Sequence, residues 1–177
     1  MILETERLII REYGEDDWES VHRYASDPNV TRHMLWGPNT LQETKAHIAS
    51  MLAMQSRVPR TGFEFAVTLK ETGELIGGVG LHMEGSNGEI GYCFHPGFWG
   101  QGYACESARA MLELGFGQLG LHRIYATCRP ENGGSERVMQ KLGMRKEGHL
   151  REHLLSNKGG YVDSHLYSIL VQEYGET

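Results

Sequence analysis

A glycine-rich turn between a predicted strand and a predicted helix is the feature that most constrains this chain. Residues 89–93 have the composition of a strand, and a helical pattern begins near Ala104. Between them, glycines at 97, 100 and 102 permit a tight turn whose backbone can approach a ligand closely. The first N–H groups of a helix lack intrahelical partners and lie at the positive end of its dipole. The turn is therefore predicted to bind an anion such as a phosphate or pyrophosphate.

Composition places the chain among ordinary globular proteins. It has 177 residues, so we expect a single domain over 1–177. The net charge of −6 disfavours nucleic-acid binding and gives slight support to a cationic, amine-bearing substrate. Cys93, Cys105 and Cys128 are odd in number and lack zinc-site spacing, which indicates a reducing compartment. No signal peptide and no long apolar run is present. We therefore expect a soluble cytoplasmic protein without a membrane partner.

The predicted element order is strand, two helices, three strands, helix, strand, helix, two strands. Strands are expected over 6–12, 63–69, 75–82, 89–95, 121–128, 144–155 and 161–171. Helices are expected over 16–27, 40–54, 104–116 and 132–143, the second opened by a Thr40–Glu43 capping box. This order predicts a mixed α/β fold with a largely antiparallel sheet. The crossover from 89 to 128 predicts one parallel pair.

Two further motifs match patterns in the wrong context. Residues 115–120 spell G-x-G-x-x-G, but they fall where a helix should end rather than between a strand and a helix. Residues 149–153 spell H-x-x-E-H, a zinc pattern that requires a helix, whereas this stretch resembles a strand. We interpret the glycines as a helix terminator and the histidines as surface or sheet-packed residues, and we expect no metal.

The run Glu89–Ala108 resembles motif A of the GNAT acyltransferases, with Trp99 at the position usually held by Arg or Gln. Several other stretches resemble the ribosomal-protein N-terminal (alanine/serine) acetyltransferases. They are residues 4–8, 130–135, 141–144, 148–153 and 161–163. The likeness runs through nearly the whole chain in the right order.

The resemblance implies the GNAT fold: a sheet of about seven strands, splayed between the fourth and fifth, with about four helices. It also implies acetyl-CoA as cosubstrate, with its pantetheine arm in the splay between strands 89–95 and 122–128. The implied cofactor-binding residues are Tyr92, Cys93, Phe94, Trp99, Gly100, Gln101, Gly102, Tyr103, Ala104 and Asn132. For Asn132 a plain helix N-cap is the alternative role.

Ser135 matches the serine that, in this family, donates a proton to the leaving thiolate; a helix-terminal hydroxyl bonded to backbone is the alternative. Glu89 is the first choice of general base, acting through water on the amine. Glu152 and His153 stay open as bases, and each of the three could instead be a structural polar residue. Cys93 and Cys105 could form an acyl intermediate, but small core residues are the favoured interpretation because direct transfer needs no protein nucleophile.

The leading hypothesis is an acetyl-CoA-dependent N-acetyltransferase that acts on a primary amine, with a ribosomal-protein N-terminus as a candidate acceptor. One alternative is acetylation of a small amine such as a polyamine, an amino acid or an antibiotic. Another is a non-catalytic acyl-CoA-binding module. The sequence is compatible with a monomer or a homodimer.

Overall fold

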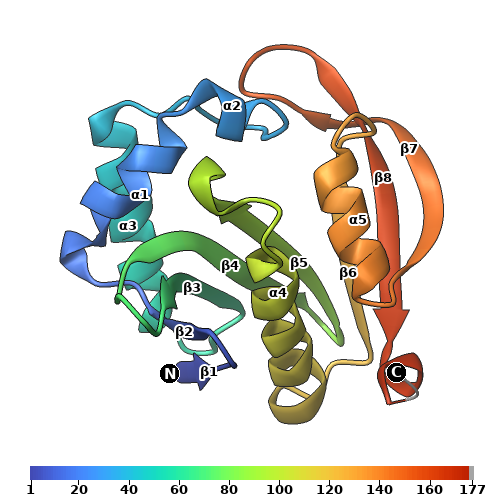
Figure 1. The fold of residues 1–177 in the computed structure, drawn as a ribbon. Coiled ribbons are helices and arrows are strands. Elements are labelled where there is room, and N and C mark those ends of the chain that lie inside the picture. Colours follow the sequence, from blue (N-terminus) through green and yellow to red (C-terminus); the bar gives the residue numbers. More distant parts are fainter. Residues whose placement is uncertain (176–177) are drawn as a thin grey trace.

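An eight-stranded, mostly antiparallel sheet forms the centre of the computed structural model, which describes residues 1–175 (Figure 1). The strands are β1 (Ile2–Glu4), β2 (Leu8–Glu12), β3 (Gly62–Leu69), β4 (Leu75–Glu84), β5 (Asn87–Phe94), β6 (Arg123–Cys128), β7 (Arg145–Leu155) and β8 (Tyr161–Leu170). Their order is β1-β2-β3-β4-β5-β6-β8-β7, and β5–β6 is the one parallel pair among residues 1–175. The seven predicted strands and the parallel crossover are confirmed. The additional strand, β1, has three residues, too few for a recognisable alternation.

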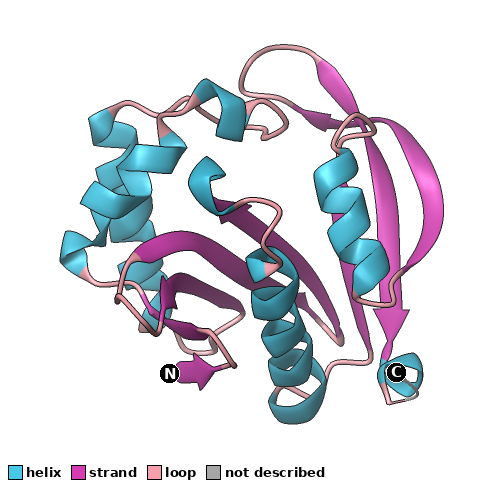
Figure 2. Ribbon diagram, viewed as in Figure 1, coloured by secondary structure: helices cyan, strands magenta, loops and turns pink. Residues whose placement is uncertain are grey.

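The four predicted helices are present, and within residues 1–175 two single-turn α-helices accompany them (Figure 2). The helices are α1 (Trp18–Ala25), α2 (Pro28–Thr31), α3 (Leu41–Gln55), α4 (Tyr103–Glu113), α5 (Gly133–Lys141) and α6 (Val171–Tyr174). The capping box at the start of α3 is confirmed, because Thr40 Oγ1 accepts the Glu43 N–H and Glu43 Oε2 accepts the Thr40 N–H. The residue Pro28 begins α2, where its missing N–H leaves no intrahelical bond unmade.

Two apolar clusters hold the helices to the sheet. One joins the sheet to α4 and α5 through residues such as Phe65, Leu81, Met111 and Met139, each fully buried or nearly so. The other, which includes Tyr24, Ile48 and Met51, joins the sheet to α1 and α3. The sheet therefore has packed helices on both of its faces.

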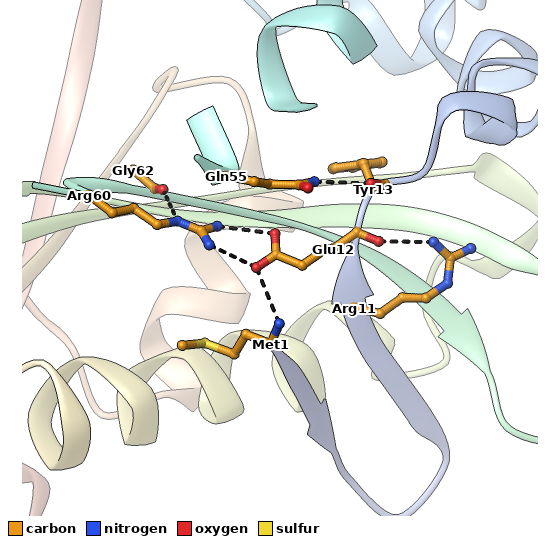
Figure 3. Close-up of polar contacts among 7 residues, drawn as sticks. All are labelled: Met1, Arg11, Glu12, Tyr13, Gln55, Arg60 and Gly62. Carbon is orange, nitrogen blue, oxygen red and sulfur yellow. Dashed lines mark hydrogen bonds and ion pairs between the residues drawn. The ribbon is translucent and has the colours of Figure 1, made fainter. Parts of the chain in front are cut away.

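The end of α3 is tied to β2 by polar contacts (Figure 3). Arg60 donates to both carboxylate oxygens of Glu12, at 2.8 and 3.1 Å, and to the Gly62 carbonyl. Gln55 Nε2 donates to the Tyr13 carbonyl at 3.0 Å. These contacts fix the loop that follows α3 against the first strands of the sheet.

The sheet divides between β5 and β6. Only three residue pairs join the two strands: Asn87 with Arg123, Gly88 with Ile124, and Glu89 with Tyr125. Beyond them β5 continues along β4 and β6 continues along β8, so the sheet opens into a V (Figure 1). The predicted splay is confirmed between the predicted strands, which are fifth and sixth in the fold because β1 precedes them.

The G-x-G-x-x-G and H-x-x-E-H runs lie in the elements that the sequence predicted for them, a helix end and a strand. The G-x-G-x-x-G run continues from α4 into a π-helical turn over Leu114–Gln118 and ends with Gly120 at φ +67°. The H-x-x-E-H run lies in β7, where His149 contacts Asp163 at 2.6 Å and His153 contacts Ser164 at 2.8 Å. Within residues 1–175, no group of three His, Cys, Asp or Glu side chains is arranged to hold a metal. None of the helices over the same residues has the length and apolar character needed to cross a membrane.

Candidate active site

The turn before α4 presents a row of unused backbone donors. Gly100 and Gly102 adopt φ values of +74° and +87°, and α4 begins directly afterwards at Tyr103. In the part of the chain that the structure describes, the N–H groups of Gly100, Gln101 and Gly102 donate to no protein acceptor, and all three residues are exposed. Exposed N–H groups at a helix start suit an anion, so the donor set fits the pyrophosphate of coenzyme A.

Arg7, which immediately precedes β2, holds this turn in place. Its Nη1 donates to the Gln101 carbonyl at 3.1 Å, and its guanidinium lies 4.4 Å from the centre of the Tyr103 ring. The same side chain is paired with Glu106 at 2.7 Å. Burial alone would raise the pKa of Glu106, but hydrogen bonds from Thr5 and Arg7 lower it below its ordinary value. Sequence reasoning missed Arg7 because 94 residues separate it from Gln101.

The edge of β5 that faces the V carries free backbone groups. The His95 N–H donates to the Ile76 carbonyl on β4, and backbone groups alternate in direction along a strand. The backbone groups of Cys93 therefore point to β4, while those of Tyr92 and Phe94 point into the V. Trp99 Nε1 donates a hydrogen bond to the Phe94 carbonyl at 2.8 Å, so that carbonyl already has a partner. The Tyr92 amide and carbonyl and the Phe94 amide can then bond an extended ligand as a sheet edge bonds a strand.

Across the V, the start of α5 faces Tyr92. Asn132 is the N-cap of α5, and its Oδ1 accepts the Ser135 N–H at 3.1 Å. The Ser135 hydroxyl lies 3.0 Å from the Tyr92 hydroxyl, which also lies 3.1 Å from the Ser135 carbonyl. Burial raises the pKa of Tyr92, and its hydrogen bond to Ser135 offsets this only in part. The phenol thus stays protonated at neutral pH and forms a hydroxyl pair with Ser135.

Among the candidate bases, Glu89 lies nearest the point where the strands part. It belongs to the last β5–β6 pair, and Thr127 Oγ1 donates to its Oε1 at 3.5 Å. Burial, followed by the charges of Glu89 and Glu84, raises the pKa of the neighbouring Tyr125. Glu152 and His153 lie instead on the edge strand β7, where Glu152 is exposed.

A second carboxylate, that of Glu64, lies near the V and belongs to no recognised sequence motif. Glu64 Oε1 contacts His82 Nε2 at 2.6 Å. The strand beside it carries Gly80, where an added Cβ would come within 2.2 Å of Glu64 Oε1. The two residues are 18 positions apart on neighbouring strands, so the pair is found only from the folded structure.

The thiols are less suited to covalent chemistry. Burial raises the pKa of Cys93 to about 12 and that of Cys128 to about 11. Cys93 packs against the cluster beneath α1 and α3. A protonated thiol is a weak nucleophile, so these two residues are better described as small core side chains.

Comparisons with known proteins identify the family that shares this fold. Residues 7–145 match the family model of the acetyltransferase (GNAT) domain. The uncharacterized N-acetyltransferase YnaD of Bacillus subtilis (strain 168) is 37% identical over 180 residues, covering 98% of this chain and 99% of the relative. The crystal structure of a GNAT-family acetyltransferase from Bacillus anthracis aligns with a TM-score of 0.86 and 36% identity, over 97% of this chain and 99% of the other.

A more distant structure shares the fold. RimL, a ribosomal L7/L12 alpha-N-protein acetyltransferase solved in complex with coenzyme A, aligns with a TM-score of 0.85 at 19% identity. The alignment covers 98% of this chain and 99% of RimL. At this identity the likeness shows a common architecture.

Proposed function

The chain belongs to the acetyltransferase (GNAT) family, and from that premise we propose that it acetylates a primary amine by direct attack on acetyl-CoA. The observation that carries the proposal is the divided sheet beside the turn. β5 and β6 part after Glu89 and Tyr125, and exposed N–H groups at 100–102 lie at the end of the opened strand. A pyrophosphate at the turn and a thioester in the V fit this arrangement.

Three groups of residues would hold acetyl-CoA. The pyrophosphate would be bound by the turn from Trp99 to Ala104, mainly through backbone N–H groups. The pantetheine arm would bond the open backbone groups of Tyr92 and Phe94. Asn132, the N-cap of α5, would contact the arm through its side-chain amide.

In the reaction, the neutral amine attacks the acetyl carbon, a C–N bond forms and the C–S bond breaks. Ser135 would give a proton to the departing thiolate, and Tyr92, 3.0 Å from its hydroxyl, would support that transfer. Glu89 would accept the amine proton through water. An α-amino group has a pKa of about 7.7–8.0, so it requires only modest help at neutral pH. Bringing the amine and the thioester together supplies much of the acceleration.

The mouth of the V favours a compact acceptor. The Asn157 N–H, from the β7–β8 turn, donates to the Leu35 carbonyl at 2.9 Å, and Lys158 Nζ donates to the Thr31 carbonyl. These bonds join the two sides of the molecule across the mouth and limit the room for a bulky protein surface. A small amine is therefore our first acceptor, and a flexible protein N-terminus, as in the ribosomal-protein acetyltransferases, is the second.

Calorimetric titration with acetyl-CoA, followed by thiol-release assays, tests the proposal. We expect saturable binding, and then turnover on members of a panel of small amines and short N-terminal peptides. No binding at millimolar acetyl-CoA would refute the proposal. Tight binding without turnover on any amine would instead support the non-catalytic acyl-CoA-binding module.

A further inference from the structure

A pocket of about 490 Å³ lies at the mouth of the V. Three segments line it: residues 32–35 after α2, residues 129–131 after β6, and residues 156–163 around the β7–β8 turn. Figure 1 shows this turn reaching toward α2, above the N-terminus of α5. We call this space the mouth pocket. Its volume is that of a small-molecule site.

Arg129 in the wall of the mouth pocket is a buried cation with an incomplete set of partners. It is 9% exposed, and its Nη2 donates to Ser164 Oγ at 2.7 Å. Its Nη1 is the one buried side-chain nitrogen or oxygen among residues 1–175 that has no hydrogen-bond partner. Burying an unpaired charged donor is costly, so an acceptor brought by a ligand would stabilise this guanidinium.

The other charges around the mouth pocket add to its positive character. Arg32 and Lys158 line it together with Arg129, against the carboxylates of Glu131 and Asp163. Asp163 is already engaged, because one of its oxygens contacts His149 Nε2 and the other accepts the Glu152 N–H. In a chain of net charge −6, this local excess of cations is a distinct feature. An anionic group is its natural complement.

The mouth pocket is close to the proposed transfer site. Arg129 follows β6 directly, and strand alternation places it on the same side as Thr127, whose hydroxyl contacts Glu89. Two residues along a strand span about 7 Å. An acceptor whose amine lies near Glu89 can thus extend an anionic group toward Arg129.

We propose that the acceptor amine carries a carboxylate and that Arg129 binds this carboxylate in the mouth pocket. The inference rests on the proposed function and names its substrate class: amino-acid-like amines rather than polyamines. Arg129 then determines specificity without taking part in the bond-breaking steps.

Matched acceptors test the proposal, each an α-amino acid paired with its carboxamide. Wild type, Arg129→Gln, Arg129→Lys and the control Arg137→Gln, an exposed arginine of α5, are compared by thiol release. We expect Arg129→Gln to lower the ratio of kcat/KM for the acid to kcat/KM for the amide at least tenfold. Arg129→Lys should retain part of the wild-type preference for the acid. Comparing ratios between variants cancels the different intrinsic reactivities of the two amines. Acetyl-CoA affinity and the Arg137→Gln ratio should stay at wild-type values.

A binding arm separates this inference from the proposed function, because it requires no turnover. N-acetylglycine and N-acetylglycinamide are titrated into the CoA-loaded protein. The acid is expected to bind at least tenfold more tightly, and Arg129→Gln should remove the difference. Equal binding of the two probes, or an acid preference that survives in both Arg129 variants, would overturn the inference. Acid-selective binding without turnover on any amine would refute the transferase proposal alone.

Discussion

At the scale of single residues, the proposed chemistry depends on contacts between side chains that are distant in the sequence. Tyr92 and Ser135 are 43 residues apart, yet their hydroxyls lie 3.0 Å from each other across the divided sheet. Tyr92 comes from the strand that would bind the cosubstrate, and Ser135 from the helix opposite. The hydroxyl pair therefore exists only because the fold places α5 across the V.

Substitution of Ser135 by Ala tests its role as proton donor. Losing a positioned general acid should lower kcat on the order of 10²-fold, with the acetyl-CoA affinity unchanged. Tyr92→Phe keeps the ring and removes only the hydroxyl, so it should also lower kcat. Stopped-flow thiol release and calorimetry measure the two quantities. Unaltered kcat in both variants would show that the hydroxyl pair is structural.

The raised pKa of Cys93, about 12, predicts an unreactive thiol. At pH 8 almost no thiolate is present, so alkylation by iodoacetamide should be far slower than for a free thiol. Cys93→Ala should retain nearly wild-type turnover. Mass spectrometry of the protein quenched during turnover is the check, and an acetyl group found on Cys93 would contradict direct transfer.

The pair of Glu64 and His82 predicts a pH-dependent contribution to stability. The hydrogen bond to Glu64 raises the pKa of His82 above its ordinary value, against the opposing effect of burial. The stabilisation is thus fully present below about pH 6.5 and is lost as pH rises through the raised pKa. Because His82 is half exposed, we expect less than about 1 kcal/mol.

Denaturant unfolding of wild type and His82→Gln, measured from pH 5 to pH 9, checks this prediction. The difference in unfolding free energy should be largest at the acidic end and shrink toward pH 9. A difference that grows with pH would contradict the assignment.

At the scale of elements, local sequence signals were sufficient for most of the fold. The capping box at Thr40, the alternation of β6 and the glycines before α4 each use short-range chemistry, and each predicted its element. The short strand β1 and the single-turn helices α2 and α6 carry too few residues for a periodic pattern.

The candidate site likewise contains some residues that could be predicted from the sequence and others that could not. The turn at 99–104 and the N-cap Asn132 could be predicted from their neighbours in the sequence. The contacts of Arg7 with Gln101 and of Arg129 with Ser164 could not, since they join residues 94 and 35 positions apart. Such contacts depend on how the helices and strands pack against one another, and the spacing of residues within one segment does not predict that packing.

Alanine substitutions of two glycines separate the effect of the turn on ligand binding from the effect of backbone strain on stability. Gly102 and Gly73 have φ values of +87° and +72°, so alanine at either position should destabilise the fold by about 1–2 kcal/mol. Gly73 lies in the β3–β4 turn, away from the proposed cosubstrate. Only Gly102→Ala should therefore weaken acetyl-CoA binding, by at least tenfold. Equal affinities for the two variants, measured by calorimetry, would remove the turn from the binding site.

At the scale of the whole molecule, the sheet consists of two halves that are joined only by the short pairing of β5 with β6. Strands β1 to β5 pair continuously on one side, and β6, β8 and β7 pair on the other, with three residue pairs between the halves. α1 and α3 belong to the first half and α5 to the second (Figure 1). An extended ligand between β5 and β6 would replace the missing backbone bonds, so binding should stiffen the whole molecule as well as the site.

Residue-resolved amide exchange with and without coenzyme A tests this account most directly. In the free protein the Tyr92 and Phe94 amides face the open V, while the Cys93 amide between them is bonded to β4. We expect coenzyme A to slow exchange at Tyr92 and Phe94 at least tenfold and to leave Cys93 nearly unchanged. Unaltered exchange at Tyr92 and Phe94 under saturating coenzyme A would show that the ligand does not occupy the divided sheet.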